Sequence, residues 1–236
     1  MSAPAVDRLR SVALSAGTAL EGASPEEILR WAVGEFGPKF CIASSMGDAV
    51  LATLAADAVG PAGPKVDVVF LDTGYHFAET IGTRDAVAAT LPVTVVTIQP
   101  RQTVAEQDAA YGARLYERDP DRCCALRKVE PLARALAPYD AWASGIRRDE
   151  AATRREIGVV EWDEKRGMVK VNPLAAWTQA DVDAYIERRG VLVNPLVYDG
   201  YPSIGCAPCT RRVALGEDAR AGRWAGTGKT ECGLHG

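Results

Sequence analysis

Three short runs rich in β-branched and apolar residues constrain the fold of this 236-residue chain more than any other feature. They occupy residues 40–43, 66–71 and 93–98, and stretches with helical periodicity, about 49–58 and 78–90, lie between them. Apolar runs of this length separated by helices are typical of buried parallel strands joined by crossover helices. The sequence therefore predicts an α/β fold, doubly wound, with a mainly parallel sheet.

Local start and stop signals predict two further helices and a fourth strand. Ser24 and Glu27 have the spacing of a capping box, which predicts a helix that begins just after Ser24. Another helix is predicted to begin after Thr178 and to end at Gly190, since glycine commonly follows the last turn of a helix. A further strand is expected at residues 141–144.

The character of the chain changes after about Asn194, where glycine and proline become frequent and periodicity fades. The length allows one substantial core, so we expect a single domain. Within it we separate an α/β body, residues 1–205, from a C-terminal tail, residues 206–236. We expect the tail to be a mobile arm that docks over the ligand-binding edge of the sheet. A simply disordered tail is the alternative.

Composition and charge exclude several classes of protein. The net charge is -4 and the isoelectric point is about 5.4, which gives a nucleic-acid partner no support. No apolar stretch approaches the ~18 residues of a membrane span, and the first residues do not form a secretory signal. We therefore expect a cytoplasmic protein, in a reducing compartment where paired cysteines favour metal or redox chemistry over structural disulfides.

Four cysteines form two close pairs, Cys123-Cys124 and Cys206-Ala-Pro-Cys209. The second pair can face one metal centre across a tight turn. Adjacent ligands are unusual for tetrahedral zinc, whereas the separated irons of a cubic cluster suit neighbouring side chains. The pattern therefore favours an iron–sulfur cluster over zinc, and a vicinal thiol pair with an unrelated turn is the remaining alternative. Cys41 lies inside a predicted strand and is expected to pack in the core.

Cys232 stands apart from these pairs, near the end of the chain and beside Gly233. Glycine permits close approach to a substrate, and His235 or nearby arginines favour a thiolate. We interpret Cys232 as a candidate nucleophile. A surface cysteine without a role is the alternative.

Two sets of polar residues predict an anion site. The loops 44–48 and 72–76 follow predicted strands, at the edge where ligands bind in this architecture. Ordinary turn and cap chemistry is the alternative for them. The stretch 145–155 holds four arginines, whose guanidinium groups suit phosphate or sulfate oxygens, although a solvated charged loop is equally consistent. The tail adds four more arginines: Arg211, Arg212, Arg220 and Arg223.

Together these motifs resemble the assimilatory adenylyl-sulfate (APS) reductases of the phosphoadenylyl-sulfate reductase superfamily. The resemblance runs from about Lys39 to His235. The segments that carry it are Leu71-Asp72-Thr73-Gly74-Tyr75-His76-Phe77, Cys123-Cys124-x-x-Arg127-Lys128-Val129-x-Pro131-Leu132, Gly145-x-Arg147-Arg148-Asp149, Tyr201-Pro202-Ser203-Ile204-Gly205-Cys206-x-Pro208-Cys209-Thr210 and Glu231-Cys232-Gly233-Leu234-His235. The family fold is a modified ATP-pyrophosphatase α/β domain.

The resemblance implies a [4Fe–4S] cluster on Cys123, Cys124, Cys206 and Cys209. It implies that Cys232 attacks the sulfur of APS, expels AMP and becomes an S-sulfocysteine, from which thioredoxin or a similar dithiol releases sulfite. Matching positions place Lys128, Arg220, Arg223 and His235 at the phosphosulfate, with Arg154 as a further candidate. Ser44, Ser45 and Asp72 would line the nucleotide pocket.

One departure from the wider superfamily bears on the reaction. ATP-pyrophosphatases carry Ser-Gly-Gly-x-Asp-Ser in the first loop, whereas residues 44–49 here read Ser-Ser-Met-Gly-Asp-Ala. Loss of the glycines removes room for a pyrophosphate, which argues against ATP hydrolysis and against a tRNA-thiolating type of enzyme. A 3′-phosphoadenylyl-sulfate (PAPS) reductase, or an enzyme that accepts both substrates, is the closest alternative, and a non-catalytic zinc module is another. The sequence leaves the oligomeric state open.

Overall fold

A six-stranded sheet forms the centre of the computed structural model, which describes residues 3–60, 63–225, 229 and 231–234. The strand order is β3-β2-β1-β4-β6-β5, and every neighbouring pair is parallel except the antiparallel β5–β6 hairpin. This arrangement confirms the predicted α/β fold with a mainly parallel sheet. The strands are β1 (Phe40–Ala43), β2 (Asp67–Leu71), β3 (Thr94–Ile98), β4 (Ala141–Ser144), β5 (Val160–Asp163) and β6 (Met168–Val171).

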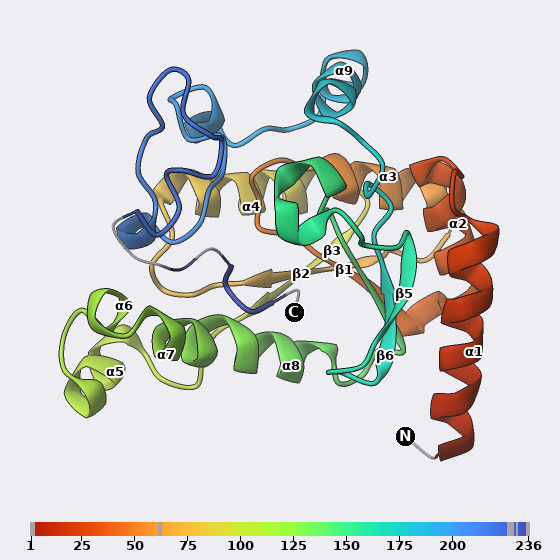
Figure 1. The fold of residues 1–236 in the computed structure, drawn as a ribbon, viewed down its shortest axis with the longest axis horizontal. Helices are drawn as coiled ribbons and strands as arrows, with labels where there is room; N and C mark the ends of the chain where they lie inside the picture. The colour runs from red at the N-terminus through yellow and green to blue at the C-terminus, as the bar shows by residue number, and fades with distance from the viewer. Residues whose placement is uncertain (1–2, 61–62, 226–228, 230, 235–236) are drawn as a thin grey trace.

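Helices cover both faces of this sheet (Figure 1). The helices α2 to α4 lie on one face, α8 lies across the other, and α1 packs beside the β5–β6 hairpin. A π turn, Ala125–Val129, joins α7 to α8. The helices are α1 (Ala3–Ala19), α2 (Pro25–Phe36), α3 (Val50–Val59), α4 (Ala78–Thr90), α5 (Val104–Tyr111), α6 (Leu115–Arg118), α7 (Pro120–Cys124), α8 (Glu130–Leu136) and α9 (Gln179–Arg189).

The predicted helix signals act as expected. The hydroxyl of Ser24 accepts a hydrogen bond from the backbone of Glu27, whose carboxylate accepts one from the backbone of Ser24. Thr178 and Asp181 make the same reciprocal pair at the start of α9. Gly190 ends α9 in the left-handed conformation, with φ of 61°, where a side chain would be strained. Both predicted capped helices are confirmed.

Alternate strand residues enter two different apolar clusters, as the period-2 geometry of a strand requires. Phe40 and Ile42 of β1 join the large core formed with α1 to α3. Cys41, between them, faces the smaller cluster beneath α8, where it meets Leu132 and Trp142. Cys41 is fully buried, which confirms its expected packing role, and this burial raises the pKa of its thiol far above the usual range.

Several elements were not predicted from the sequence: α1, the helices α5 to α8, and the β5–β6 hairpin. In the part of the chain that the structure describes, no helix is both long and apolar enough to cross a membrane.

Candidate active site

A cavity of about 460 Å³ opens at the carboxyl edge of the sheet. The chain passes from β1 to β2 and β3 on one side and then returns to place β4 on the other side of β1, which creates a topological switch point between β1 and β4. Ligands of doubly wound folds bind at such points. Its wall combines the loops after β1, β2 and β4 with tail residues that include Arg220, Arg223 and Cys232.

Hydrogen bonds between its own residues fix the conformation of the loop after β1. The hydroxyl of Ser44 accepts from the backbone N–H of Met46 at 3.1 Å, and the carboxylate of Asp48 accepts from Val50 at 2.9 Å. Met46 is buried with φ of +58°, a conformation that glycine adopts more easily. Burial raises the pKa of Asp48, which Arg147 partly opposes.

Ser44 and Ser45 both line the cavity, as expected for a nucleotide pocket. Asp72 does not: its carboxylate accepts a hydrogen bond from the backbone of Gly74 at 3.1 Å and caps the turn after β2. The structure therefore brings two of the three predicted nucleotide-pocket residues, Ser44 and Ser45, to the cavity. The third, Asp72, stabilises its own turn instead.

Basic side chains gather at the end of the cavity that holds Cys232. Lys128, Arg154, Arg220 and Arg223 all line the cavity. Lys128 and Arg223 interact electrostatically with Cys232, and the other two pair with Glu231 next to it. The guanidinium of Arg223 donates to Ser203 Oγ and to the carbonyl of Ile204, each at 3.2 Å, and its carbon lies 4.5 Å from the ring centroid of Trp224. Burial lowers the pKa of Arg223, and Arg220 adds to the effect. His235, predicted at the same site, lies outside the described residues.

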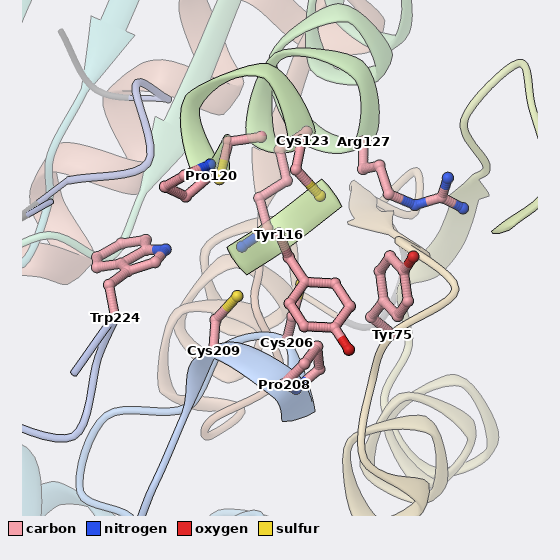
Figure 2. A pocket seen from close by; sticks show the side chains of 11 residues that line it. Tyr75, Tyr116, Pro120, Cys123, Arg127, Cys206, Pro208, Cys209 and Trp224 are labelled. Carbon is pink, nitrogen blue, oxygen red and sulfur yellow. The ribbon is translucent and has the colours of Figure 1, made fainter. Parts of the chain in front are cut away.

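The four paired cysteines line a second, smaller pocket next to this basic end (Figure 2). The adjacent pair comes from the last turn of α7, and the other pair comes from a 3₁₀ turn, Ala207–Cys209, with the residue before it. Aromatic and cationic side chains complete the pocket: Tyr75, Tyr116, Arg127, Lys128 and Trp224. Lys128 belongs to both pockets, so one ammonium group faces the thiols and the cavity together.

The donor set fits a thiolate-ligated iron–sulfur cluster. All four thiols are free. Burial together with the neighbouring thiols raises the pKa of Cys123 to about 12 and that of Cys209 to about 11, so these groups are neutral on their own and a bound metal would have to replace their protons. Thr73 Oγ1 lies 3.3 Å from the sulfur of Cys206, so a hydroxyl supports one thiol. Among the described residues, no three His, Cys, Asp or Glu side chains already form a metal-coordinating group. The thiols thus share a pocket without forming a finished coordination shell.

The tail lies across the site with its last described residues docked. Cys232 lines the main cavity, and Leu234 packs against the apolar cluster under α8. The chain around them is held through Glu231, which Arg154 contacts with two nitrogens.

Sequence reasoning did not assign roles to Thr73, Glu231 or Trp224. Thr73 and Glu231 stand inside motifs that were recognised, yet a hydroxyl or carboxylate in a motif does not reveal which group it meets. Trp224 follows Arg223 directly, and only the fold shows that its ring supports the guanidinium and lines the cysteine pocket.

Comparison with known proteins identifies the family. The model of the phosphoadenosine phosphosulfate reductase domain matches residues 39–212, the part of the chain that carries both pockets except for the last tail residues. The chain belongs to this family. Within the phosphoadenosine phosphosulfate reductase family, the protein named adenosine 5′-phosphosulfate reductase from Streptomyces coelicolor is 64% identical, over 98% of this chain and 96% of its own length.

A second family member, the adenosine 5′-phosphosulfate reductase of Mycolicibacterium smegmatis, is 56% identical, over 97% of this chain and 95% of its own length. Among solved structures, the phosphoadenylyl-sulfate reductase of Candida auris in complex with phosphate is 32% identical with a TM-score of 0.68, and covers 89% of this chain and 98% of its own. The FMN adenylyltransferase of Candida glabrata shares the fold alone, at 12% identity and a TM-score of 0.58, over 88% of this chain and 74% of its own.

Proposed function

We propose that this protein reduces adenylyl sulfate to sulfite and AMP, as a step of sulfate assimilation toward cysteine, with Cys232 as the nucleophile. The observation that carries the proposal is the position of Cys232 at the basic end of a nucleotide-sized cavity, together with Lys128, Arg220 and Arg223. The two bacterial relatives named adenosine 5′-phosphosulfate reductase, at 64% and 56% identity, support APS as the substrate.

The reaction proceeds in two displacements at sulfur. The thiolate of Cys232 attacks the sulfonyl sulfur of APS, a sulfur–sulfur bond forms, and the bond from that sulfur to the bridging oxygen breaks, so that AMP leaves with the electron pair. A dithiol then attacks the Cys232 sulfur of the S-sulfocysteine and sulfite leaves. The second thiol of the dithiol breaks the mixed disulfide, which frees Cys232 and leaves the reductant oxidised.

The charges in the cavity suit this chemistry. Lys128, Arg220 and Arg223 would hold the phosphate and sulfate oxygens, and they would stabilise the charge that develops on the departing phosphate. His235 is proposed beside them. Arg154 was expected there too, but its guanidinium binds Glu150 and Glu231. Ser44 and Ser45 would hold the nucleotide at the other end, and Asp72, predicted for the same role, would act through the turn after β2.

We also propose that Cys123, Cys124, Cys206 and Cys209 hold a [4Fe–4S] cluster. The cluster would supply a fixed charge near the sulfate end of the substrate and would not need to carry electrons. Lys128 and Trp224 both line the two pockets, and Lys128 is the charged side chain of the pair, so we propose that it couples the cluster site to the substrate.

Thioredoxin, or a similar dithiol protein, is the proposed reductant, and the cytoplasm is the proposed compartment because free thiols persist there. The division into a body of residues 1–205 and a catalytic tail of residues 206–236 remains part of this proposal. The tail supplies the nucleophile and two cluster ligands, while the body supplies the nucleotide site.

The nucleophile is tested by intact mass after mixing with APS in the absence of reductant. The native protein gains the mass of SO₃, and Cys232→Ser does not while it keeps the visible absorption of the cluster. An SO₃ adduct on Cys232→Ser contradicts the assignment. Sulfite release from APS and from PAPS, measured side by side, separates the proposed activity from that of a PAPS reductase or a dual enzyme.

The cluster is tested by colour and metal content. A brown protein with a broad visible band, about four iron atoms per chain, and loss of both in Cys206→Ala are the expected results. A matched Cys41→Ala variant keeps the colour because Cys41 packs in the core under α8. A colourless zinc-loaded protein would contradict the cluster and favour the zinc-binding alternative.

A further inference from the structure

A continuous series of charged groups connects the loop after β4 to the residue that precedes Cys232. The backbone N–H of Arg147 donates to the carboxylate of Glu150 at 3.2 Å, and Glu150 pairs with Arg154. Arg154 then donates through Nε and Nη2 to the two carboxylate oxygens of Glu231, at 3.0 and 2.9 Å. Arg154 of the body therefore binds the tail at Glu231, the residue directly before Cys232.

The contact between Arg154 and Glu231 has the geometry of a specific, bidentate ion pair. Two parallel N–H donors on one carboxylate fix orientation as well as distance, and the side chain of Arg154 is only 9% exposed. Arg220 adds a weaker contact to the same carboxylate at 3.4 Å. All three nitrogens of the Arg154 guanidinium already meet a carboxylate, from Glu150 or Glu231, so three of its five N–H donors are bound to the protein itself.

The tail is also fixed on the other side of Cys232. Arg166, on the β5–β6 hairpin, donates to the carbonyl of Leu234 at 2.8 Å, and Lys165 donates to the carbonyl of Gly233 at 3.3 Å. Arg166 itself is paired with Asp163, so it is a rigid donor. The reactive cysteine thus lies between two anchored points of the chain.

We propose that Glu231 is a positioning residue, and that its bidentate pair with Arg154 aligns Cys232 with the sulfur it attacks. Arg154 then acts on the tail, which differs from the substrate contact expected from the sequence. The inference rests on the proposed function, because it takes Cys232 as the nucleophile. Correct alignment of a nucleophile is worth large rate factors, since a shift on the order of 1 Å costs roughly a hundredfold.

The test compares Glu231→Gln and Arg154→Gln with the matched control Glu217→Gln in the full-length, cluster-loaded protein. Glu217 is also a tail carboxylate in an ion pair, with Arg211, but it has no contact with Arg154 or Glu231. Without substrate, the rate at which iodoacetamide alkylates Cys232 is followed by peptide mass. We expect roughly a tenfold faster rate in the first two variants, which corresponds to about 1.4 kcal/mol of lost docking, and no change in the control.

Steady-state kinetics with APS provide the second readout. In Glu231→Gln we expect kcat to fall roughly tenfold or more while the KM changes by less than about threefold, because alignment is lost and the substrate contacts remain. Glu231→Asp, which keeps the charge, restores part of kcat.

An unchanged alkylation rate overturns the inference, and so does a large rise in KM with kcat preserved, which would make Arg154 a substrate contact. Because Glu231 lies on the tail, its variant leaves the body intact even if Arg154→Gln fails to fold. Faster alkylation in a protein that does not reduce APS would support the positioning pair and refute the proposed function, so the two failures are distinguishable.

Discussion

The position of the Arg223 guanidinium requires that residue 205 be a glycine. A Cβ built on Gly205 would lie 2.5 Å from Nη2 and 2.7 Å from Cζ of this arginine, closer than real contacts allow. The guanidinium cannot easily move away, because it is buried, bonded to Ser203 and to the carbonyl of Ile204, and placed over Trp224. The glycine therefore positions a cation of the basic end.

Gly205→Ala is expected to lower kcat/KM for APS by roughly tenfold or more, because a displaced bidentate or stacked arginine loses about 1.4 kcal/mol or more of transition-state stabilisation. A double-mutant cycle with Arg223→Lys checks the cause. If Gly205 acts through Arg223, the alanine costs much less in the lysine background, whereas an equal loss in both backgrounds would contradict this explanation.

Asp48 gives the fold a pH dependence. Its pKa is raised by burial, partly opposed by the bond from Val50 and the charge of Arg147, while Glu150 raises it further. The folded chain therefore holds this proton to higher pH than the unfolded chain, whose aspartates titrate near pH 4. As pH rises from about 4 through the raised value, unfolding releases a proton and stability falls.

Asp48→Asn is expected to remove this dependence, to raise the urea midpoint at pH 7 and to leave it nearly unchanged at low pH. Urea unfolding at several pH values provides the measurement, with Asp181→Asn as a control. Asp181 is exposed and its pKa is lowered by its bonds to Thr178, so the control shifts stability in the opposite direction. A midpoint of Asp48→Asn that falls at neutral pH would contradict the assignment.

The identity of the site residues was far more predictable than their contacts. Cysteine spacing predicts that Cys123, Cys124, Cys206 and Cys209 lie together, and the structure gathers them in one pocket. The bond between Arg154 and Glu231 joins residues 77 positions apart, so no local pattern can predict it. Asp72 illustrates the same limit, because its position at a strand end does not reveal that its carboxylate bonds to its own turn.

At the scale of elements, α1 packs so closely on the edge strand β5 that glycine is required at the contact. A Cβ on Gly17 would lie 2.6 Å from the carbonyl oxygen of Val160, a backbone atom that cannot rotate away. Gly34 occupies the equivalent penultimate turn of α2, and nothing lies within 4 Å of its Cβ position. The two helices thus offer a matched pair of glycines.

Gly17→Ala is expected to destabilise the protein by about 1–3 kcal/mol, because the helix must shift away from β5. Gly34→Ala is expected to stabilise it by about 0.5–1 kcal/mol, because alanine favours the helix and meets no neighbour. Chemical denaturation of both variants provides the measurement. Stabilisation by Gly17→Ala would show that α1 does not make this close contact.

Most elements with local signals were predicted, and most that depend on tertiary packing were not. The helix α5 is an exception, because Thr103 and Glu106 form a capping box at its start and it was still not predicted. The helices α2 and α9 carry capping boxes, and β1 to β4 are rich in apolar residues, so sequence alone located them. The strand β5 reads Val-Glu-Trp-Asp, with charged residues at alternate positions, and exists because β6 pairs with it. The helix α1 has no acidic residue in its first turn and no basic residue in its last, so the charges that often mark helix ends are missing.

For the molecule as a whole, the cavity spans body and tail, so a bound nucleotide should stabilise both. AMP at about one hundred times its Kd adds about 2.7 kcal/mol, which corresponds to a Tm increase of roughly 5–10 °C for a chain of this size. Differential scanning calorimetry with AMP and with 3′-phosphoadenosine 5′-phosphate measures the effect. At equal concentrations of the two nucleotides, AMP is expected to give the larger Tm increase because it binds with the lower Kd, and the reverse would favour PAPS as the substrate.

The separation of the two cysteine pairs along the chain has a consequence for biosynthesis. Cys123 and Cys124 leave the ribosome early, but their partners follow only after all six strands and α9 have been made. Because synthesis runs from the N-terminus, all six strands are available before Cys206 and Cys209 can meet Cys123 and Cys124. The proposed cluster would therefore enter a nearly finished protein, and a chain truncated before Cys206 would lack two of the four proposed ligands. Insertion of the proposed cluster would then occur only after the body of the domain has been translated.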